Sequence, residues 1–289
     1  MRNTLVNFVT DTAKKGKAHA YSALQPERYL VGLEKQQAGK DKTILITGAS
    51  SGLGENMARQ FAKLGYNLAI CARRESRLEQ LKGDLNEQYP DIRIEYRTLD
   101  VADYKAVFEV FQAFAKDFGS IDKVVVNAGV GESRRIGKGR FETNRRTAEI
   151  NFVGALAQCE AAMQIFRAQN SGQLVVISSM SAMRGLPRHM TTYGACKAGL
   201  AYLAEGIRAD MILTKLPIKI STIYPGYIRT EINTNAKPLP FEVDADTGSR
   251  AIVAAIESEV EEACVPSVPW SLVGQMMKHL PLPLVNKIS

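Results

Sequence analysis

Short apolar segments alternate with longer amphipathic segments from residue 42 to about residue 267. Each short segment is a nearly continuous run of apolar and β-branched residues, which is typical of strands that are buried on both faces. In the longer segments, apolar residues recur at the three- and four-residue spacing of an amphipathic helix. The predicted strands are 42–48, 66–72, 92–98, 122–129, 172–179, 218–226 and, less regularly, 263–267. The predicted helices are about 53–65, 75–88, 103–118, 143–169, 191–214 and 246–260.

This alternation of strands and helices predicts an α/β fold. Right-handed crossovers would place the strands in one doubly wound parallel sheet of about seven strands, with helices on both faces. In such a sheet, ligands bind beyond the carboxyl ends of the strands. We expect one main domain at 41–267. An extension at 1–40, interpreted as a short basic helix and a linker, precedes it, and an apolar tail at 268–289 follows it.

The composition is that of a folded protein that works in water. Hydrophobic residues make up 45% of the 289 residues and charged residues 23%. No apolar run reaches the roughly 18 residues of a membrane-spanning helix, and the first residues lack the apolar core of a secretion signal. The four cysteines are isolated and the three histidines show no metal-ligand spacing. We therefore expect free thiols, no metal site and a cytoplasmic location.

The net charge of +7 admits nucleic acid, anionic lipid or a phosphorylated ligand as a partner. No base-stacking or groove-reading motif is present in the sequence, which argues against nucleic acid. The remaining choice depends on where the basic residues lie and on which residues end the strands.

The first predicted strand ends in TGASSGLG, which places Gly48, Gly52 and Gly54 between a strand and a helix. Glycine lets the backbone approach a phosphate closely, and the helix N-terminus offers free N–H groups. In this position the turn predicts a dinucleotide site, and the alternative is a purely structural turn.

The second predicted strand ends in Ala72, which Arg73 and Arg74 follow. Sites for NAD usually carry an acidic residue here that binds the ribose 2′-hydroxyl. An arginine would instead bind a 2′-phosphate through charge-assisted hydrogen bonds, so Arg73 favours NADP(H). Arg74 can also be interpreted as the solvated start of the next helix.

The ends of the third and fourth predicted strands carry further candidates. Asp100 could accept a hydrogen bond from an adenine amino group, and Asp100 or Asp103 could cap the next helix. Asn127 and Gly129, in the segment NAG, would let the backbone pass close to a flat cofactor ring. Asn151 lies inside a long helical segment, where asparagine is unfavourable, and indicates a kink or a bound water.

Two serines and a tyrosine–lysine pair follow. Ser178 and Ser179 end the fifth strand, and we expect only one of them to face the cleft because side chains alternate. Tyr193 and Lys197 lie about one helical turn apart. A cation beside a tyrosine lowers the tyrosine pKa, which would make Tyr193 a usable acid/base. Cys196 between them is interpreted as a small buried side chain, with a reactive thiol as the alternative.

Together, TGASSGLG, NAG, the mid-helix asparagine, SS, YGACK and PGYIRTE occur in the order found in the short-chain dehydrogenase/reductase family. The sequence resembles an NADP-type member of that family over 42–230 and, more loosely, over 231–267. This resemblance implies a Rossmann-type fold and an NADP(H)-dependent oxidoreductase. Such an enzyme interconverts a carbonyl and an alcohol by hydride transfer.

The resemblance also implies roles for single residues. Tyr193 would be the acid/base and Ser179 would polarise the substrate carbonyl. Lys197 would bind the nicotinamide ribose and lower the tyrosine pKa, while Asn151 would order a proton-relay water. The implied cofactor-binding residues are Gly48, Ser50, Ser51, Gly52, Leu53, Gly54, Arg73, Asp100, Val101, Asn127, Ala128, Gly129, Tyr193, Lys197, Pro225, Gly226, Ile228 and Thr230.

One spacing departs from the family pattern. Ser179 precedes Tyr193 by 14 residues, where 13 is commoner in the family. The shared GLP at 185–187 places the extra residue in the loop that follows it, so Ser179 keeps its role. Ser178 and Ser181 are the alternatives.

The substrate is less well specified. The segment 134–146 holds the densest basic cluster, either a solvated loop or a site for an anionic carrier such as a coenzyme A or acyl-carrier-protein phosphate. The segment at about 231–247 is expected to form a substrate loop, in which Leu239 and Phe241 could line an apolar pocket. The tail at 268–289 could be a pocket wall, a subunit contact or a peripheral membrane contact.

We therefore expect a hydrophobic, lipid-like or acyl-type small-molecule substrate and a homodimer or homotetramer. The alternative function is that of a non-catalytic NADP-binding regulator or scaffold. The intact set of Ser179, Tyr193 and Lys197 argues against it, because binding alone does not need Tyr193.

Overall fold

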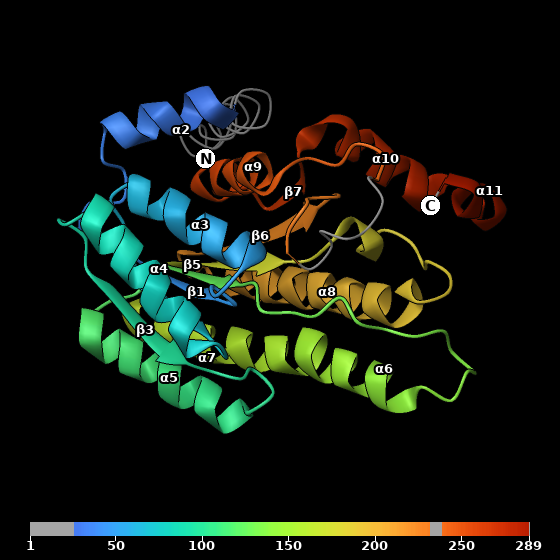
Figure 1. The fold of residues 1–289 in the computed structure, drawn as a ribbon, viewed down its shortest axis with the longest axis horizontal. Coiled ribbons are helices and arrows are strands. Elements are labelled where there is room, and N and C mark those ends of the chain that lie inside the picture. The colour runs from blue at the N-terminus through green and yellow to red at the C-terminus, as the bar shows by residue number, and fades with distance from the viewer. Residues whose placement is uncertain (1–25, 232–238, 289) are drawn as a thin grey trace.

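The computed structural model describes residues 26–231 and 239–288. Its centre is a seven-stranded parallel sheet with the order β3-β2-β1-β4-β5-β6-β7 (Figure 1). The strands are β1 Thr43–Thr47, β2 Asn67–Ala72, β3 Ile94–Thr98, β4 Lys123–Val126, β5 Gly172–Ile177, β6 Ile218–Pro225 and β7 Glu262–Val265. The predicted fold class is confirmed, and a strand is found in each predicted segment.

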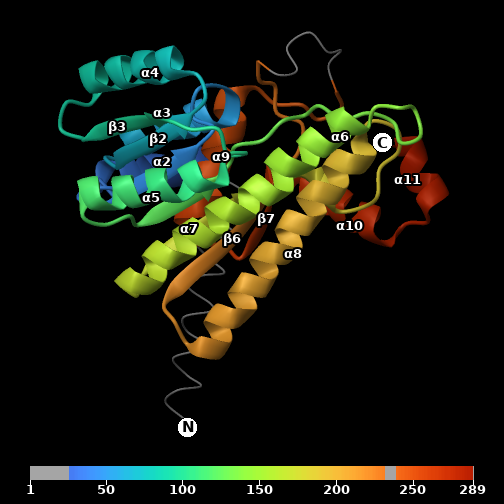
Figure 2. The ribbon, with the colours of Figure 1, turned by 90° about the horizontal axis from the view of Figure 1, so that it is seen from below.

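Helices cover both faces of the sheet, as Figure 2 shows for the face with α5, α7 and α8. These three helices span Tyr104–Phe118, Gly154–Gln169 and Met190–Thr214. The other face carries α3 (Gly52–Lys63), α4 (Glu75–Gln88) and α9 (Ala245–Glu257). Side chains of β1 alternate between the two cores: Ile44 and Ile46 pack with α3 and α9, and Leu45 packs with α5 and α7. Burial on both sides explains the continuous apolar runs of the strands.

The long helical segment predicted at 143–169 is divided in the structure. It consists of α6 (Phe141–Ala148), a π-helical turn (Glu149–Val153) and α7. Asn151 lies in the middle of the π-helical turn, so the irregularity that this residue indicated is present. Single π-turns of this kind are frequent at functional sites.

Both ends of the described chain form helices outside the sheet. In the extension, α2 (Pro26–Lys35) packs against α9, while residues 1–25 lie outside the described part. The tail forms α10 (Ser267–His279) and α11 (Leu282–Ile288). Trp270 and Met277 of α10 are buried against Met180 and Tyr224. One side of the tail is therefore packing surface. In the described residues, no helix is long and apolar enough to cross a membrane.

The strand order reverses between β1 and β4. The chain winds outward from β1 to β2 and β3, then returns to β4 on the other side of β1 and continues to β7. The loops after β1 and β4 consequently diverge to opposite faces and leave a crevice at the carboxyl edge of the sheet. The candidate site lies there.

At the opposite edge of the sheet, a buried ion pair links α9 to β4. Lys123 Nζ lies 3.5 Å from Glu257 Oε1, and the two side chains are 9% and 6% exposed. Lys123 also donates to Gln173 Oε1 at 2.6 Å, and the Tyr66 hydroxyl donates to Glu257 at 2.9 Å. Each buried charge thus has polar partners, which buried ions require.

We expect Glu257→Ala to destabilise the protein by about 3 kcal/mol, because Lys123 would remain buried without its counter-ion. Urea unfolding followed by circular dichroism measures this loss. Glu109→Ala, which breaks the exposed pair between Lys105 and Glu109, is the matched control and should change stability by less than about 0.5 kcal/mol. Equal losses of stability for the two substitutions would contradict the interpretation of Glu257 as the buried counter-ion of Lys123.

Candidate functional site

Most of the predicted site residues line one cavity of about 640 Å³ at the carboxyl edge of the sheet. Glycine-turn, strand-end and catalytic candidates come together there although they are far apart in the sequence. The predicted residues in the cavity wall are Gly48, Ser50, Ser51, Leu53, Arg73, Asp100, Val101, Asn127, Ala128, Gly129, Ser179, Tyr193, Lys197, Pro225, Gly226, Ile228 and Thr230. Gly52, Gly54 and Asn151 are not among the lining residues.

The glycine turn owes its shape to two of its glycines in different ways. Gly48 has a φ of +69°, a conformation that side chains with a Cβ rarely adopt. At Gly54, a Cβ would lie 2.3 Å from the carbonyl oxygen of Gly48 and 2.7 Å from Asn127 Nδ2. The start of α3 therefore packs directly on the turn and on β4, which leaves the first backbone N–H groups of α3 at the cavity.

Thr47 and Asn127 join the carboxyl ends of β1 and β4. The backbone N–H groups of Asn127 and Ala128 each donate to Thr47 Oγ1 at 3.0 Å. The Asn127 side chain donates in turn to the Thr47 carbonyl at 2.8 Å. The role of Thr47 is not predictable from the sequence, because its partners are about 80 residues away.

The two arginines after β2 differ in their partners. Arg74 Nε donates to Ser50 Oγ at 3.2 Å, and Arg74 Nη2 donates to Ser51 Oγ. Its Nη1 lies 4.0 Å from the Glu231 carboxylate. Arg73 is exposed at the cavity wall and makes no hydrogen bond or ion pair with any described residue. Arg73 thus remains available to a ligand, whereas Arg74 braces the glycine turn.

The two aspartates after β3 have different roles in the structure. Asp103 caps α5, since its side chain accepts a hydrogen bond from the Ala106 N–H at 3.1 Å. Asp100 accepts one from the Ala102 N–H at 3.1 Å and lines the cavity. Asp100 is therefore the aspartate that a ligand in the cavity can reach.

Asn151 fixes the loop that follows β4. Its Oδ1 accepts from the Val130 N–H at 2.8 Å, and its Nδ2 donates to the Val130 carbonyl at 2.8 Å. A Cβ on Gly129 would lie 2.8 Å from Asn151 Oδ1 and 3.6 Å from Lys197 Nζ. Glycine at this position therefore lets the loop pass between the π-helical turn and the lysine.

The serine–tyrosine–lysine set lies where β5 and α8 meet. Lys197 Nζ donates to the carbonyl of Ile177 at 2.9 Å, and Ser178 Oγ donates to the carbonyl of Lys197 at 2.8 Å. The Ser179 side chain is close enough to the Tyr193 hydroxyl to favour its ionised form, and Lys197 Nζ is 5.9 Å from the centre of the tyrosine ring. Because Ser178 bonds to the backbone, Ser179 is the serine beside the tyrosine.

Burial governs the protonation of this set. It lowers the pKa of the Lys197 ammonium from 10.5 to about 8. Burial also raises the pKa of Tyr193, and the hydrogen bond with Ser179 offsets only part of this effect. The expected lowering of the tyrosine pKa by Lys197 is thus not found in the protein alone. A lysine that is itself partly desolvated and has a lowered pKa is a weaker source of positive charge than the sequence suggested.

Two further expectations have clear outcomes. Cys196 is buried, and burial raises the pKa of its thiol, which fits a small packed side chain. Phe241 is 60% exposed and packs edge-on against Trp270, with ring centres 6.3 Å apart. Neither Phe241 nor Leu239 lines the cavity, and residues 232–238 of the expected substrate loop lie outside the described residues.

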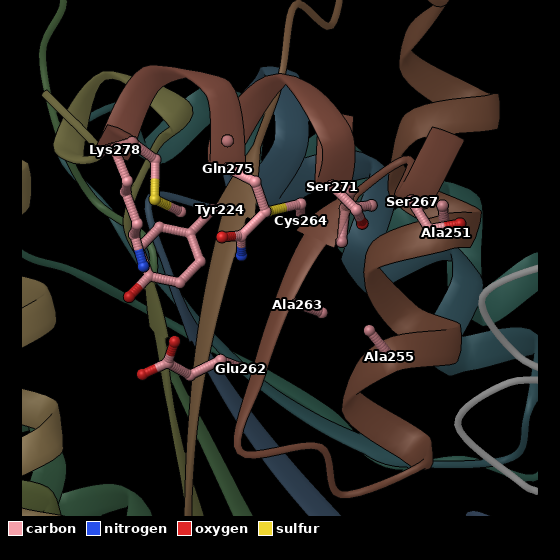
Figure 3. A pocket seen from close by; sticks show the side chains of 13 residues that line it. Tyr224, Ala251, Ala255, Glu262, Ala263, Cys264, Ser267, Ser271, Gln275 and Lys278 are labelled. Atoms are coloured by element: carbon pink, nitrogen blue, oxygen red, sulfur yellow. The ribbon is translucent and has the colours of Figure 1, made fainter. Parts of the chain in front are cut away.

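A smaller cavity of about 220 Å³ lies at the β7 edge of the sheet. Figure 3 shows Tyr224 of β6, Cys264 of β7, and Gln275 and Lys278 of α10 around it. None of the predicted site residues lines this cavity. The candidate active site is therefore the larger cavity.

Comparison with known proteins places this geometry in a family. A family model described as short chain dehydrogenase matches residues 42–239. An "uncharacterized oxidoreductase" of Mycobacterium tuberculosis is 43% identical over 260 residues, which cover 90% of this chain and 100% of that protein. Another, of Myxococcus xanthus, is 33% identical over 85% of this chain and 95% of that protein. The chain belongs to the short-chain dehydrogenase family.

Solved structures of similar fold agree with this assignment. The alcohol dehydrogenase of Thermococcus sibiricus, in complex with 5-hydroxy-NADP, has a TM-score of 0.69 at 27% identity and covers 78% of this chain and 97% of that chain. A levodione reductase has a TM-score of 0.64 at 25% identity, over 83% of this chain and 91% of that chain. This short-chain dehydrogenase is therefore an oxidoreductase.

Lys197 should make the stability of this short-chain dehydrogenase increase with pH. Its pKa is about 8 in the folded protein, and the ordinary lysine value of 10.5 applies to the unfolded chain, so between these values the unfolded chain binds more protons. The penalty of burying the ammonium is fully present below about pH 8 and disappears as the pH rises toward 10.5. We expect this lysine to add about 1 kcal/mol per pH unit across that range.

Urea unfolding at several pH values between these limits measures the effect. Lys197→Met should be more stable than the wild type near pH 8, and the difference should shrink with rising pH. Groups common to the two proteins cancel in this comparison. A difference that does not vary with pH would show that the ammonium is not desolvated.

Proposed function

We propose that this short-chain dehydrogenase interconverts a carbonyl and an alcohol with NADP(H), with Tyr193 as the acid/base. The observation that carries the proposal is the meeting of two groups of residues in one cavity. Ser179, Tyr193 and Lys197 line one side of the cavity, and the glycine turn that opens α3 lies on the other.

The cavity fits a dinucleotide cofactor at three points. The turn at Gly48 and the packing at Gly54 bring the N-terminus of α3 to the cavity, where its N–H groups can bind a diphosphate. Gly129 leaves the space that a Cβ would fill beside Lys197. Arg73 has no partner among the described residues and lies where a ribose 2′-phosphate would require a cation. These features support NADP(H) over NAD(H).

The chemistry follows from the positions of the side chains. When bound, the nicotinamide cofactor supplies or accepts the hydride. In reduction, Tyr193 donates its proton to the carbonyl oxygen, which the Ser179 hydroxyl holds by a hydrogen bond; in oxidation, Tyr193 accepts that proton. Lys197, fixed to Ile177 at 2.9 Å, has further N–H groups for the nicotinamide ribose. Asn151 holds the Val130 backbone and so positions the loop beside the ring.

Tyr193 needs a lower pKa than its buried position gives it, because an acid/base works best near the operating pH. Moving a tyrosine pKa from about 10 to about 7 requires roughly 4 kcal/mol. The Lys197 ammonium and, in the oxidation direction, the positive ring of the oxidised cofactor are the two charges that can supply it. In the oxidation direction, part of this lowering of the Tyr193 pKa would thus occur only when the oxidised cofactor is bound.

We expect Tyr193→Phe to reduce turnover at least about a thousandfold, because the proton donor is lost, while NADPH still binds. Absorbance at the NADPH band measures turnover, and calorimetry measures binding. Tyr104→Phe, on exposed α5 surface, is the control and should leave both unchanged. Retained turnover in Tyr193→Phe would exclude this residue as the acid/base. NADPH binding by a wild-type protein that reduces no carbonyl would favour the non-catalytic regulator.

Arg73→Ala should weaken NADPH binding about tenfold to a hundredfold, since one charge-assisted contact to the 2′-phosphate is lost, and should leave NADH binding nearly unchanged. The control is Arg77→Ala, because Arg77 is paired with Glu231 at 3.7 Å and does not line the cavity. A preference of the wild type for NADH, or equal losses for both cofactors, would contradict this assignment.

The substrate that we propose is a hydrophobic, lipid-like carbonyl compound or its alcohol. A panel of acyl-thioesters, long-chain aldehydes, steroids and sugars, compared by kcat/KM, identifies the class. A preference for sugars would overturn this part of the proposal.

We also propose a cytoplasmic homodimer or homotetramer. Helix α8 exposes three large side chains to water: Tyr202 (76%), Ile212 (69%) and Leu213 (81%). Exposed apolar side chains of this kind on one helix indicate a surface that another protein surface covers. Light scattering in solution gives the mass of the particle. A mass equal to that of a single chain at all concentrations would contradict the homodimer or homotetramer.

A further inference from the structure

Apolar and basic side chains gather at one end of the molecule, around the mouth of the large cavity. The loop 133–140 with the start of α6, the loop 183–189, and the helices α10 and α11 form this end, as both views show (Figures 1 and 2). Hydrogen bonds connect the three parts: Ser133 Oγ donates to the His189 carbonyl, and Arg184 Nη1 donates to the Lys278 carbonyl at 3.5 Å. We call the exposed side chains of these three parts the mouth surface.

The apolar part of the mouth surface is large for a face in contact with water. Ile136 and Phe141 are 62% and 71% exposed, and Met276 of α10 is 40% exposed. Leu282 and Leu284 of α11 are 45% and 47% exposed. Single exposed apolar residues need no explanation, but several on adjoining elements mark an interaction site.

The charged part of the mouth surface is almost entirely basic. Its basic residues are Arg134, Arg135, Lys138, Arg140, Arg188 and Lys278, and the half-buried Arg184 lies beside them. None of them makes an ion pair with a described residue, in contrast to Arg59 and Arg145, which are paired with carboxylates elsewhere on the surface. The segments 133–141, 180–204 and 263–289 contain no aspartate or glutamate. Glu142, at the edge of the surface, is paired with Arg145.

The mouth surface adjoins the cavity directly. Gly131 and Glu132 line the cavity, and the chain continues from them into the exposed basic loop. On the other side, Met180 of the turn after Ser179 packs against Trp270 of α10. A molecule held at this surface is therefore at the cavity entrance.

We propose that the mouth surface docks on a lipid bilayer with anionic headgroups. The exposed apolar side chains enter the interface between headgroups and acyl chains, and the arginines and lysines contact the phosphates. A second copy of this chain fits the same surface poorly, because a two-fold contact would bring unpaired basic residues together. The lipid-like substrate would then reach the cavity from the bilayer, and this last step alone rests on the proposed function.

Flotation of the full chain with vesicles tests the docking. Binding is expected to vesicles of phosphatidylcholine with phosphatidylserine, to decrease at high salt, and to be weak with phosphatidylcholine alone. The variant Arg134→Ser/Arg135→Ser/Lys138→Ser should bind the anionic vesicles at least about tenfold more weakly. Its control, Lys63→Ser/Lys105→Ser/Lys116→Ser, removes the same charge from other exposed helices and should bind like the wild type.

The apolar contribution is tested in the same way. Phe141→Ser/Leu284→Ser should also reduce binding, whereas Val31→Ser, on the exposed part of α2, should not. Thermal unfolding establishes that each variant is folded. No preference for anionic vesicles, or equal losses in the variants and their controls, would overturn the proposal. So would concentration-dependent self-association that Phe141→Ser/Leu284→Ser abolishes without any vesicle binding.

Turnover of a water-soluble carbonyl in the same preparations separates the two proposals. Turnover without vesicle binding overturns the docking and leaves the enzymatic function intact. Vesicle binding without turnover of any carbonyl supports the docking and overturns the proposed function.

Discussion

The geometry of the whole cleft depends on how the carboxyl ends of β1 and β4 are joined. Beyond the last rungs of the sheet, the Thr47 hydroxyl accepts from two backbone N–H groups, and the Asn127 amide returns a hydrogen bond to the Thr47 carbonyl. These groups are otherwise costly to leave unpaired away from water. Their bonds set the distance between the glycine turn and the loop after β4, and Gly54 closes the remaining space.

Lys197 has a structural function in addition to the chemical one proposed for it. Its ammonium donates to the carbonyl of Ile177 at the end of β5, and its own carbonyl accepts from Ser178, the residue that follows β5. Two bonds in opposite directions therefore attach α8 to β5 next to Ser179 and Tyr193. The cost of burying the ammonium appears as its lowered pKa. The attachment of α8 therefore depends on a buried ammonium, although burial lowers the pKa of that group.

The sequence predicts those features that short segments carry by themselves. Apolar runs predict the strands and the glycines predict the turn. The four-residue spacing of Tyr193 and Lys197, together with their position after the fifth strand, makes them candidates. What it does not predict depends on partners that are distant in the chain. Thr47 acquires its role from residues 80 positions away, and Arg74 from Ser50 and Glu231. The raised pKa of Tyr193 is also of this kind, because desolvation depends on the residues that the fold packs around the side chain.

The π-helical turn around Asn151 separates the geometry of the cleft from the packing of the core. Such a turn accommodates one residue more than a regular helix would, so it changes the backbone locally while the helices on either side keep their register. Loss of a single residue between Glu149 and Val153 would restore regular helix, and Cys159 and Phe166, which are 1% and 0% exposed, would keep their places in the core. The contacts of Asn151 with the Val130 backbone would be lost instead. A change in the length of this segment would therefore alter the loop after β4 and leave α7 packed against the sheet.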